Sequence, residues 1–174
     1  MSRDDAGLAR LNALPAALAE ADLRACCASP DWVAAMMAGR PYPDRAALVR
    51  QGEQVLAGLD WPGIEQALAA HPRIGERMAG RGRESAWSSQ EQSGMGQASE
   101  ATRAALVAAN QAYEARFGHV FLICATGLSD AQMLAEARRR VHHDEATERG
   151  VVRAELGRIV ALRLAKLLDA EVGP

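Results

Sequence analysis

The sequence has few cysteines, few aromatic side chains and no long apolar run. Its three cysteines are Cys26, Cys27 and Cys124, an odd number without the C-x-x-C spacing of metal and redox sites. This disfavours a disulfide framework and a zinc knuckle, and it favours a reducing, cytoplasmic location. The opening MSRDDAGLAR lacks the apolar core of a signal peptide. No segment reaches the roughly 20 apolar residues of a membrane-spanning helix.

A strong charge of one sign is also missing. The formal net charge is −2, which gives no reason to expect a nucleic acid or an anionic membrane as partner. Hydrophobic residues make up 49% of the chain, yet only 4% is aromatic, and Ala, Leu, Glu and Arg recur throughout. This composition favours packed helices over a β-sandwich. A length of 174 residues suits one domain spanning residues 1–174.

Helix signals recur along the whole chain. The expected helices cover residues 8–20, 30–38, 44–58, 60–70, 88–117, 129–141 and 144–169. Ser29, Asp44, Asp60 and Ser129 are suitable N-cap residues, and Gly118 is a suitable C-terminal cap. Residues 75–87 are expected to form a polar loop, whereas periodicity does not assign the apolar run 120–125. The sequence therefore predicts an all-α, single-domain helical bundle.

One arginine breaks the apolar pattern of the last expected helix. At about 100° per residue, one arc of this helix carries Val152, Leu156, Ile159, Val160 and Leu167. Arg163 projects into the middle of that arc. A guanidinium there must be paired or must line a polar cavity. Two interpretations stay open: a structural salt bridge, or an arginine that binds a carboxylate or ureido oxygen at the floor of a pocket.

The stretch SSQEQ also has two interpretations. Ser88 and Glu91 have the S-x-x-E spacing of a capping box at a helix N-terminus, and on spacing alone this structural role is favoured for Glu91. A helix N-terminus also holds anions, so Glu91 and Gln92 could instead face a substrate while Ser88 caps the helix.

His71 is the best candidate for acid–base chemistry. In AHPRIGE it stands directly before Pro72, where a helix has to end. It is either a surface cap or a group held for proton transfer, since neutral imidazole accepts a proton near physiological pH. The other histidines are weaker signals. His119 is expected to pack locally, and the adjacent pair His142 and His143 is expected at the surface without metal-ligand spacing.

Several stretches together resemble one family, the decarboxylases of 2-oxo-4-hydroxy-4-carboxy-5-ureidoimidazoline (OHCU), which act in urate breakdown. The matching stretches are LNALP (11–15), CCASPDWVAAMMAGRPYPD (26–44), AHPRIGE (70–76), SSQEQSGM (88–95), NQAYEARFGHVFLICATG (110–127) and ELGRIVALRLAKLL (155–168). They run in the family's order and cover nearly the whole chain. The resemblance implies an all-α fold, a homodimer, no metal or organic cofactor, and release of CO2 from OHCU to give (S)-allantoin.

The resemblance also implies a set of site residues. His71 matches the family's catalytic histidine and Glu91 the acidic residue of its EQ motif. The substrate-binding positions that it implies are Pro72, Ser88, Gln92, Phe121, Leu122, Ile123 and Arg163. Two features depart from the family pattern: Trp87 replaces an acidic residue, and the loop 76–86 lacks the expected lysine.

The chemistry of OHCU fits a site without a cofactor. The imine carbon beside the carboxylated carbon takes up the electron pair, so neither pyridoxal phosphate nor thiamine is required. Two other functions remain open at this point. One is hydrolysis of a related ureide, which a metal or an activated nucleophile would support. The other is a non-catalytic helical dimer that binds a ligand or partner, with Glu91 only a cap and Arg163 only an ion pair.

Overall fold

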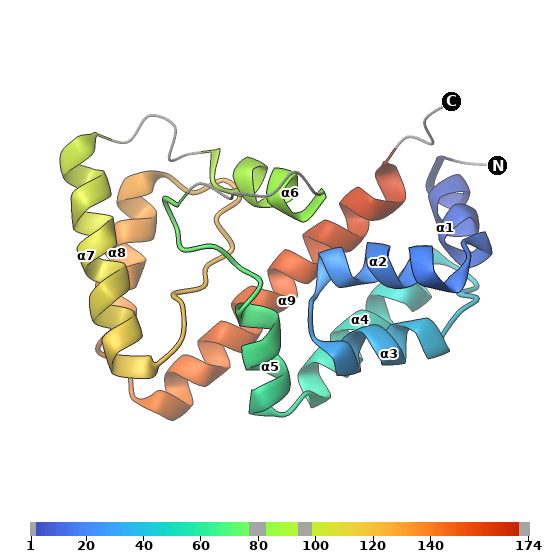
Figure 1. Ribbon diagram of the computed structural model, residues 1–174, viewed down its shortest axis with the longest axis horizontal. Helices are drawn as coiled ribbons and strands as arrows, with labels where there is room; N and C mark the ends of the chain where they lie inside the picture. Colours follow the sequence, from blue (N-terminus) through green and yellow to red (C-terminus); the bar gives the residue numbers. More distant parts are fainter. Residues whose placement is uncertain (1–2, 77–82, 94–98, 171–174) are drawn as a thin grey trace. The chain divides into compact units, whose positions relative to one another are not determined.

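The computed structural model describes residues 3–76, 83–93 and 99–170. Within these ranges the regular elements are all helices (Figure 1), so the predicted all-α fold is confirmed. They are α1 (Arg3–Ala13), α2 (Ala16–Cys26), α3 (Pro30–Ala38), α4 (Arg45–Gly58), α5 (Trp61–Leu68), α6 (Arg83–Glu91), α7 (Glu100–Phe117), α8 (Asp130–Arg140) and α9 (Glu145–Asp169). No helix in the described ranges combines the length and the apolar character needed to cross a bilayer.

The contacts within the chain divide it into two compact units. The first comprises residues 1–67 and 157–174, and the second residues 68–156. Helix α9 therefore contributes its first half to the second unit and its second half to the first. The assignment of residues 1–174 to one domain stays a prediction.

Local capping chemistry sets the helix starts in the first unit. Ser29 Oγ accepts from the N–H of Trp32 at 3.5 Å, with Pro30 in the first turn of α3. Asp44 Oδ1 accepts from Ala47 N–H at 2.7 Å and begins α4. These predicted caps are confirmed, but the single helix expected over residues 8–20 is wrong. Pro15 divides it into α1 and α2, because a proline excludes the helical conformation from the residue before it.

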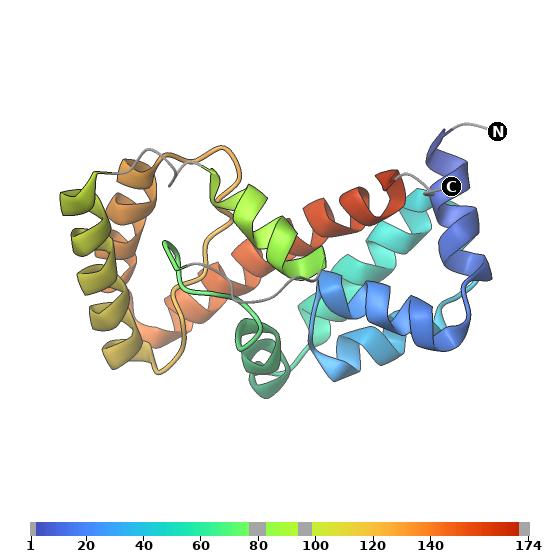
Figure 2. The same cartoon turned by 45° about the horizontal axis from the view of Figure 1, so that its top comes forward.

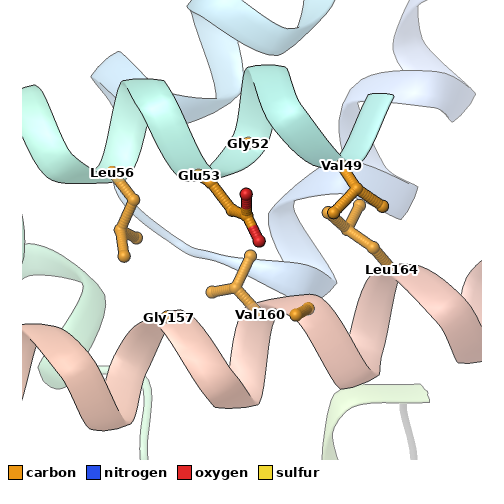
Figure 3. Close-up of a pocket in the computed structure, with 8 residues that line it drawn as sticks. Val49, Gly52, Glu53, Leu56, Gly157, Val160 and Leu164 are labelled. Carbon is orange, nitrogen blue, oxygen red and sulfur yellow. The ribbon is translucent and has the colours of Figure 1, made fainter. Parts of the chain in front are cut away.

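The core of the first unit forms where α3, α4 and the second half of α9 meet. The indole N–H of Trp32 in α3 donates to the Gly52 carbonyl of α4 at 3.1 Å. A Cβ at Gly52 would lie 3.2 Å from Leu164 Cδ1 of α9, so glycine allows this close approach. Figure 3 shows the neighbouring pocket between α4 and α9, lined by apolar side chains such as Leu56 and Val160 together with Glu53. No predicted site residue lines this pocket.

The second unit is built on the pair α7 and α8, which lie side by side in Figures 1 and 2. Gly118, at φ 79°, ends α7 in the left-handed conformation, and Ser129 caps the start of α8, both as predicted. The cap at Ser129 is a complete capping box with Gln132. The buried core of this unit consists of Ile74, Leu106, Tyr113, Phe121, Ile123, Ala125, Met133 and Ala137. The apolar run 120–125 is irregular chain that passes through this core.

The expected helix over residues 88–117 is wrong. The chain forms α6 (Arg83–Glu91) and then α7, which begins at Glu100 with Ser99 as its N-cap. The loop expected over residues 75–87 is wrong from Arg83 onward for the same reason. Gly94 and Gly96, which weaken a helix, lie outside the described residues.

Candidate active site

His71 lies in the short connection that follows α5. Its backbone N–H donates to the carbonyl of Leu68 at 2.9 Å, which closes the last turn of that helix. Pro72 cannot donate a backbone hydrogen bond, and it keeps His71 out of the helical conformation. Both residues are partly buried. The predicted helix end before Pro72 is therefore confirmed, and it leaves the imidazole on a short, constrained segment.

Two side chains of α7 fix the next residues of this connection. The Arg73 guanidinium pairs with both carboxylate oxygens of Glu114, with Nε–Oε1 2.6 Å and Nη2–Oε2 3.0 Å. Ile74 enters the core, and its carbonyl accepts from the Asn110 amide at 3.1 Å. The pairing with Glu114 also raises the pKa of Arg73. The segment that carries His71 is thus attached to α7 at two successive residues.

A third attachment joins the same segment to the end of α6. Gly75 adopts a left-handed φ of 90°, and its N–H donates to Oε1 of Gln92 at 2.9 Å. An L-residue is strained in this conformation, which explains the glycine. Gln92, predicted to bind substrate, therefore has a structural contact through its oxygen. The structure brings together the two stretches that contain His71 and Glu91.

Ser88 and Glu91 are both buried, with exposed fractions of 3% and 8%. Their interpretation as a capping box is wrong, because Ser88 is an interior residue of α6 and Glu91 is its last residue. Glu91 and Gln92 also do not lie at a helix N-terminus, as the alternative interpretation required, because α6 ends at Glu91. At the C-terminal end the helix dipole disfavours a carboxylate. Trp87 is also buried, with the Arg83 guanidinium 5.8 Å from the centre of its ring.

The segment of Phe121, Leu122 and Ile123 is buried, with exposed fractions of 2%, 3% and 6%. The Leu122 carbonyl accepts from Nη1 of Arg140 at 2.7 Å. Two residues further, the Cys124 N–H donates to Oε2 of Glu155 at 2.8 Å. Phe121 and Ile123 belong to the same core cluster as Ile74, so this segment and the connection that carries His71 pack on one core.

Sequence reasoning missed the buried ion pair of Arg140 and Glu148, which are each 0% exposed. Oε1 of Glu148 accepts from Arg140 Nε and Nη2 at 2.9 and 2.6 Å, and from the Tyr113 hydroxyl at 2.6 Å. Burial, and next the hydrogen bond to Glu148, raise the pKa of Tyr113. A signal was present: Met133, Ala137 and Arg140 follow helical i, i+4, i+7 spacing and are all buried.

The two weaker histidine predictions have different outcomes. His143 is not a purely surface residue, since it is partly buried and its Nδ1 lies 2.9 Å from Oε2 of Glu148. His119 packs locally as predicted, edge-on to the Tyr113 ring with the ring centres 5.5 Å apart. Within the described ranges, no group of three or more His, Cys, Asp or Glu has an arrangement that could hold a metal ion.

Arg163 belongs to the first unit. Its side chain is 1% exposed, so the prediction that it faces the core is confirmed. Nη1 donates to the carbonyl of Ala25 at 3.2 Å. Burial raises the pKa of the nearby Cys27 thiol to about 11, and the positive charge of Arg163 opposes that rise. The other predicted site residues lie in the second unit. A common site of Arg163 with His71 and Glu91 stays a prediction.

Comparison with known proteins identifies relatives of this chain in structure and in sequence. The chain resembles a solved structure described as "Crystal structure of OHCU decarboxylase in the presence of (S)-allantoin", with a TM-score of 0.74 and 24% sequence identity over 84% of this chain and 96% of the other. A human relative, "Putative 2-oxo-4-hydroxy-4-carboxy-5-ureidoimidazoline decarboxylase", is 33% identical over 144 residues, which cover 82% of this chain and 83% of the human protein.

The Arabidopsis thaliana "Uric acid degradation bifunctional protein TTL" is 25% identical over 157 residues. The match takes in 87% of this chain but 48% of that protein, so the chain spans about half of its length. Fold and relatives together define an all-α carbon–carbon lyase of the decarboxylase class. The family model for OHCU decarboxylase matches residues 12–165. The chain belongs to the OHCU decarboxylase family, as the sequence predicted.

Proposed function

We propose that this chain converts OHCU to (S)-allantoin and CO2 in urate degradation, with no metal or organic cofactor. The family match over residues 12–165 supports the reaction. The observation that carries the site is the attachment of the His71 segment to the end of α6 through Gly75 and Gln92. We further propose a cytoplasmic homodimer whose subunit is one domain over residues 1–174.

The reaction needs little covalent help from the protein. When the bond to the carboxylate carbon breaks, its electron pair enters the adjacent imine of the ring and CO2 leaves. The imine nitrogen that receives this electron pair takes up a proton. Loss of the hydroxyl proton then gives a carbonyl, and the carbon that bears the ureido group gains a proton on one face. The protein must hold the breaking bond out of the ring plane and control these proton movements.

His71 is proposed to take the hydroxyl proton or otherwise to promote the departure of CO2. Its attachment to a proline and its partial burial support this role, because the imidazole is restrained but not enclosed. General acid–base catalysis of this kind contributes typically about 10²–10⁴-fold. The remaining acceleration then comes from orientation and from fixed dipoles around the reacting atoms.

Glu91 is proposed to orient ureido or ring N–H groups and to take part in the proton return. Glu91 is buried at the end of α6, directly before Gln92, which binds the segment of His71 through Gly75, and this placement supports the role. Pro72, Ser88 and Gln92 are proposed to contact the substrate beside it. Arg163 is proposed to bind a carboxylate or carbonyl oxygen, for which its planar fork is suited.

The function is tested with OHCU generated freshly from urate by the upstream enzymes. Circular dichroism then follows the appearance of (S)-allantoin with and without the protein. The proposal predicts fast formation of one enantiomer, against slow racemic decay without protein. A racemic product at the spontaneous rate would contradict it. Unchanged turnover with a chelator separates this reaction from a metal-dependent ureide hydrolase, and light scattering tests the dimer.

A further inference from the structure

Arg140 makes two kinds of contact from one buried guanidinium. Nε and Nη2 pair with Oε1 of Glu148, while Nη1 donates to the Leu122 carbonyl at 2.7 Å. The guanidinium carbon also lies 4.6 Å from the centre of the Phe121 ring, which is within range of a cation–π contact. One side chain of α8 thus fixes both the ring of Phe121 and the backbone of the next residue.

Glu148 is held in turn by three different elements. Besides Arg140, it accepts from the Tyr113 hydroxyl of α7 at 2.6 Å and lies 2.9 Å from Nδ1 of His143. Nε2 of His143 lies 3.1 Å from Nη1 of Arg139, and an arginine only donates. Nε2 is therefore the acceptor, and Nδ1–H donates to Glu148. Both oxygens of the carboxylate are engaged, so its orientation is fixed.

Alternate side chains of residues 121–125 belong to the core of the second unit. Phe121, Ile123 and Ala125 all belong to the same core cluster, as expected for extended chain in which every second side chain points the same way. In extended chain the backbone groups alternate as well. The Leu122 carbonyl and the Cys124 N–H lie on one edge of this segment, where Arg140 and Glu155 bind them. By the same alternation, the backbone groups of Phe121 and Ile123 are expected on the opposite edge.

We propose that Arg140, oriented by Glu148, is a positioning residue for the decarboxylation. It holds one edge of residues 121–123 so that the backbone groups of the opposite edge meet the substrate at a fixed place. This inference rests on the proposed function, but it assigns the role to residues outside the predicted site. A shift of about 1 Å in such a support can lower turnover by about 100-fold.

A purely structural role is separable from positioning. Replacing a buried ion pair by apolar residues of similar size is often neutral for stability, whereas removing one partner is strongly destabilising. The test variant is therefore the double substitution Arg140→Met with Glu148→Met. Arg138→Met is the matched control, since it makes the same change at an exposed position of α8. Both are compared with the wild-type protein in melting temperature, kcat, KM and amide hydrogen exchange.

We expect the double variant to fold, with faster amide exchange at residues 122–125 and a kcat lower by about 10- to 100-fold. Its KM changes less, and its allantoin is less enriched in the S enantiomer. Arg138→Met matches the wild type in all four measurements. Wild-type kcat and unchanged exchange at residues 122–125 in the double variant would overturn the inference.

Arg140→Lys provides a second route if the double variant does not fold. Its ammonium keeps the charge opposite Glu148 but lacks the planar fork that reaches Glu148 and Leu122 together. A folded Arg140→Lys protein with reduced kcat supports positioning, and one with wild-type kcat and exchange contradicts it. Failure of the proposed function is distinguishable from failure of this inference, because the wild type itself would then not accelerate (S)-allantoin formation. The exchange measurement would still test whether Arg140 supports residues 121–123.

Discussion

The side-chain oxygen of Gln92 accepts a 2.9 Å hydrogen bond from the backbone N–H of Gly75. This contact connects the end of α6, which carries Glu91, to the segment that carries His71. The two stretches are separated in the sequence by residues 77–82, which lie outside the described ranges. Gln92 therefore has a structural use for its oxygen, and its amide nitrogen is the group proposed to contact substrate.

Two substitutions of Gln92 separate these uses. Gln92→Glu keeps an oxygen acceptor for Gly75, so we expect a melting temperature near that of the wild type and a raised KM. The KM rises because a donor is lost and a negative charge meets an anionic substrate. Gln92→Leu removes the acceptor too, and it should lower stability by about 1 kcal/mol and also reduce kcat. Thermal unfolding and steady-state kinetics measure both. A wild-type KM in Gln92→Glu would argue against a substrate contact.

Asn110 tests whether α7 supports the His71 segment. Asn110→Ala removes the bond to the Ile74 carbonyl, so we expect a loss of about 1–3 kcal/mol in the free energy of unfolding and a lower kcat. Gln111→Ala changes an exposed neighbour on the same helix and should alter neither. Urea unfolding and turnover of OHCU provide the measurements. Wild-type kcat in the destabilised Asn110 variant would show that the hydrogen bond of Asn110 to the Ile74 carbonyl does not affect turnover.

Glu91→Gln tests the carboxylate itself. The amide has nearly the same shape, so we expect an unchanged melting temperature and a kcat lower by about 10²–10⁴-fold, in line with the loss of one acid–base group. Gln90→Glu, at an exposed position one residue earlier, is the control for a change of charge in α6. A variant that loses stability but keeps kcat would assign Glu91 to structure alone.

The pKa of Cys27 predicts a loss of stability at high pH. Burial raises it from 9.0 to about 11. Between these values the unfolded chain loses the thiol proton before the native protein does, so the free energy of unfolding falls as pH rises from 9 to 11. The full effect corresponds to about 2–3 kcal/mol. Urea unfolding at pH 8, 9, 10 and 11 should therefore show a shallower decline in Cys27→Ala than in the wild type, and parallel curves would contradict the prediction.

The sequence correctly predicted those features of the fold that depend on interactions between residues close together in the chain. The N-caps at Ser29 and Asp44 and the C-cap at Gly118 depend on groups a few residues apart, so the sequence reveals them directly. The division of α1 from α2 at Pro15 follows from the same rules, although a single helix was expected over residues 8–20.

The site was harder to predict where contacts are long-range. S-x-x-E spacing fits a helix start, yet Ser88 and Glu91 lie inside and at the end of α6, because a four-residue pattern does not determine where a helix begins. The pairing of Arg140 with Glu148 joins α8 to α9. Helical spacing shows that Arg140 faces the core, but no local rule identifies its partner.

The most direct test of the account compares the wild type with His71→Asn on freshly generated OHCU, followed by circular dichroism. Asparagine is a polar side chain that does not exchange protons at neutral pH, so it removes the proposed proton transfer. We expect rapid (S)-allantoin formation by the wild type. In the variant we expect an unchanged melting temperature and little more than the spontaneous racemic decay. A folded His71→Asn protein that forms (S)-allantoin at the wild-type rate would contradict it.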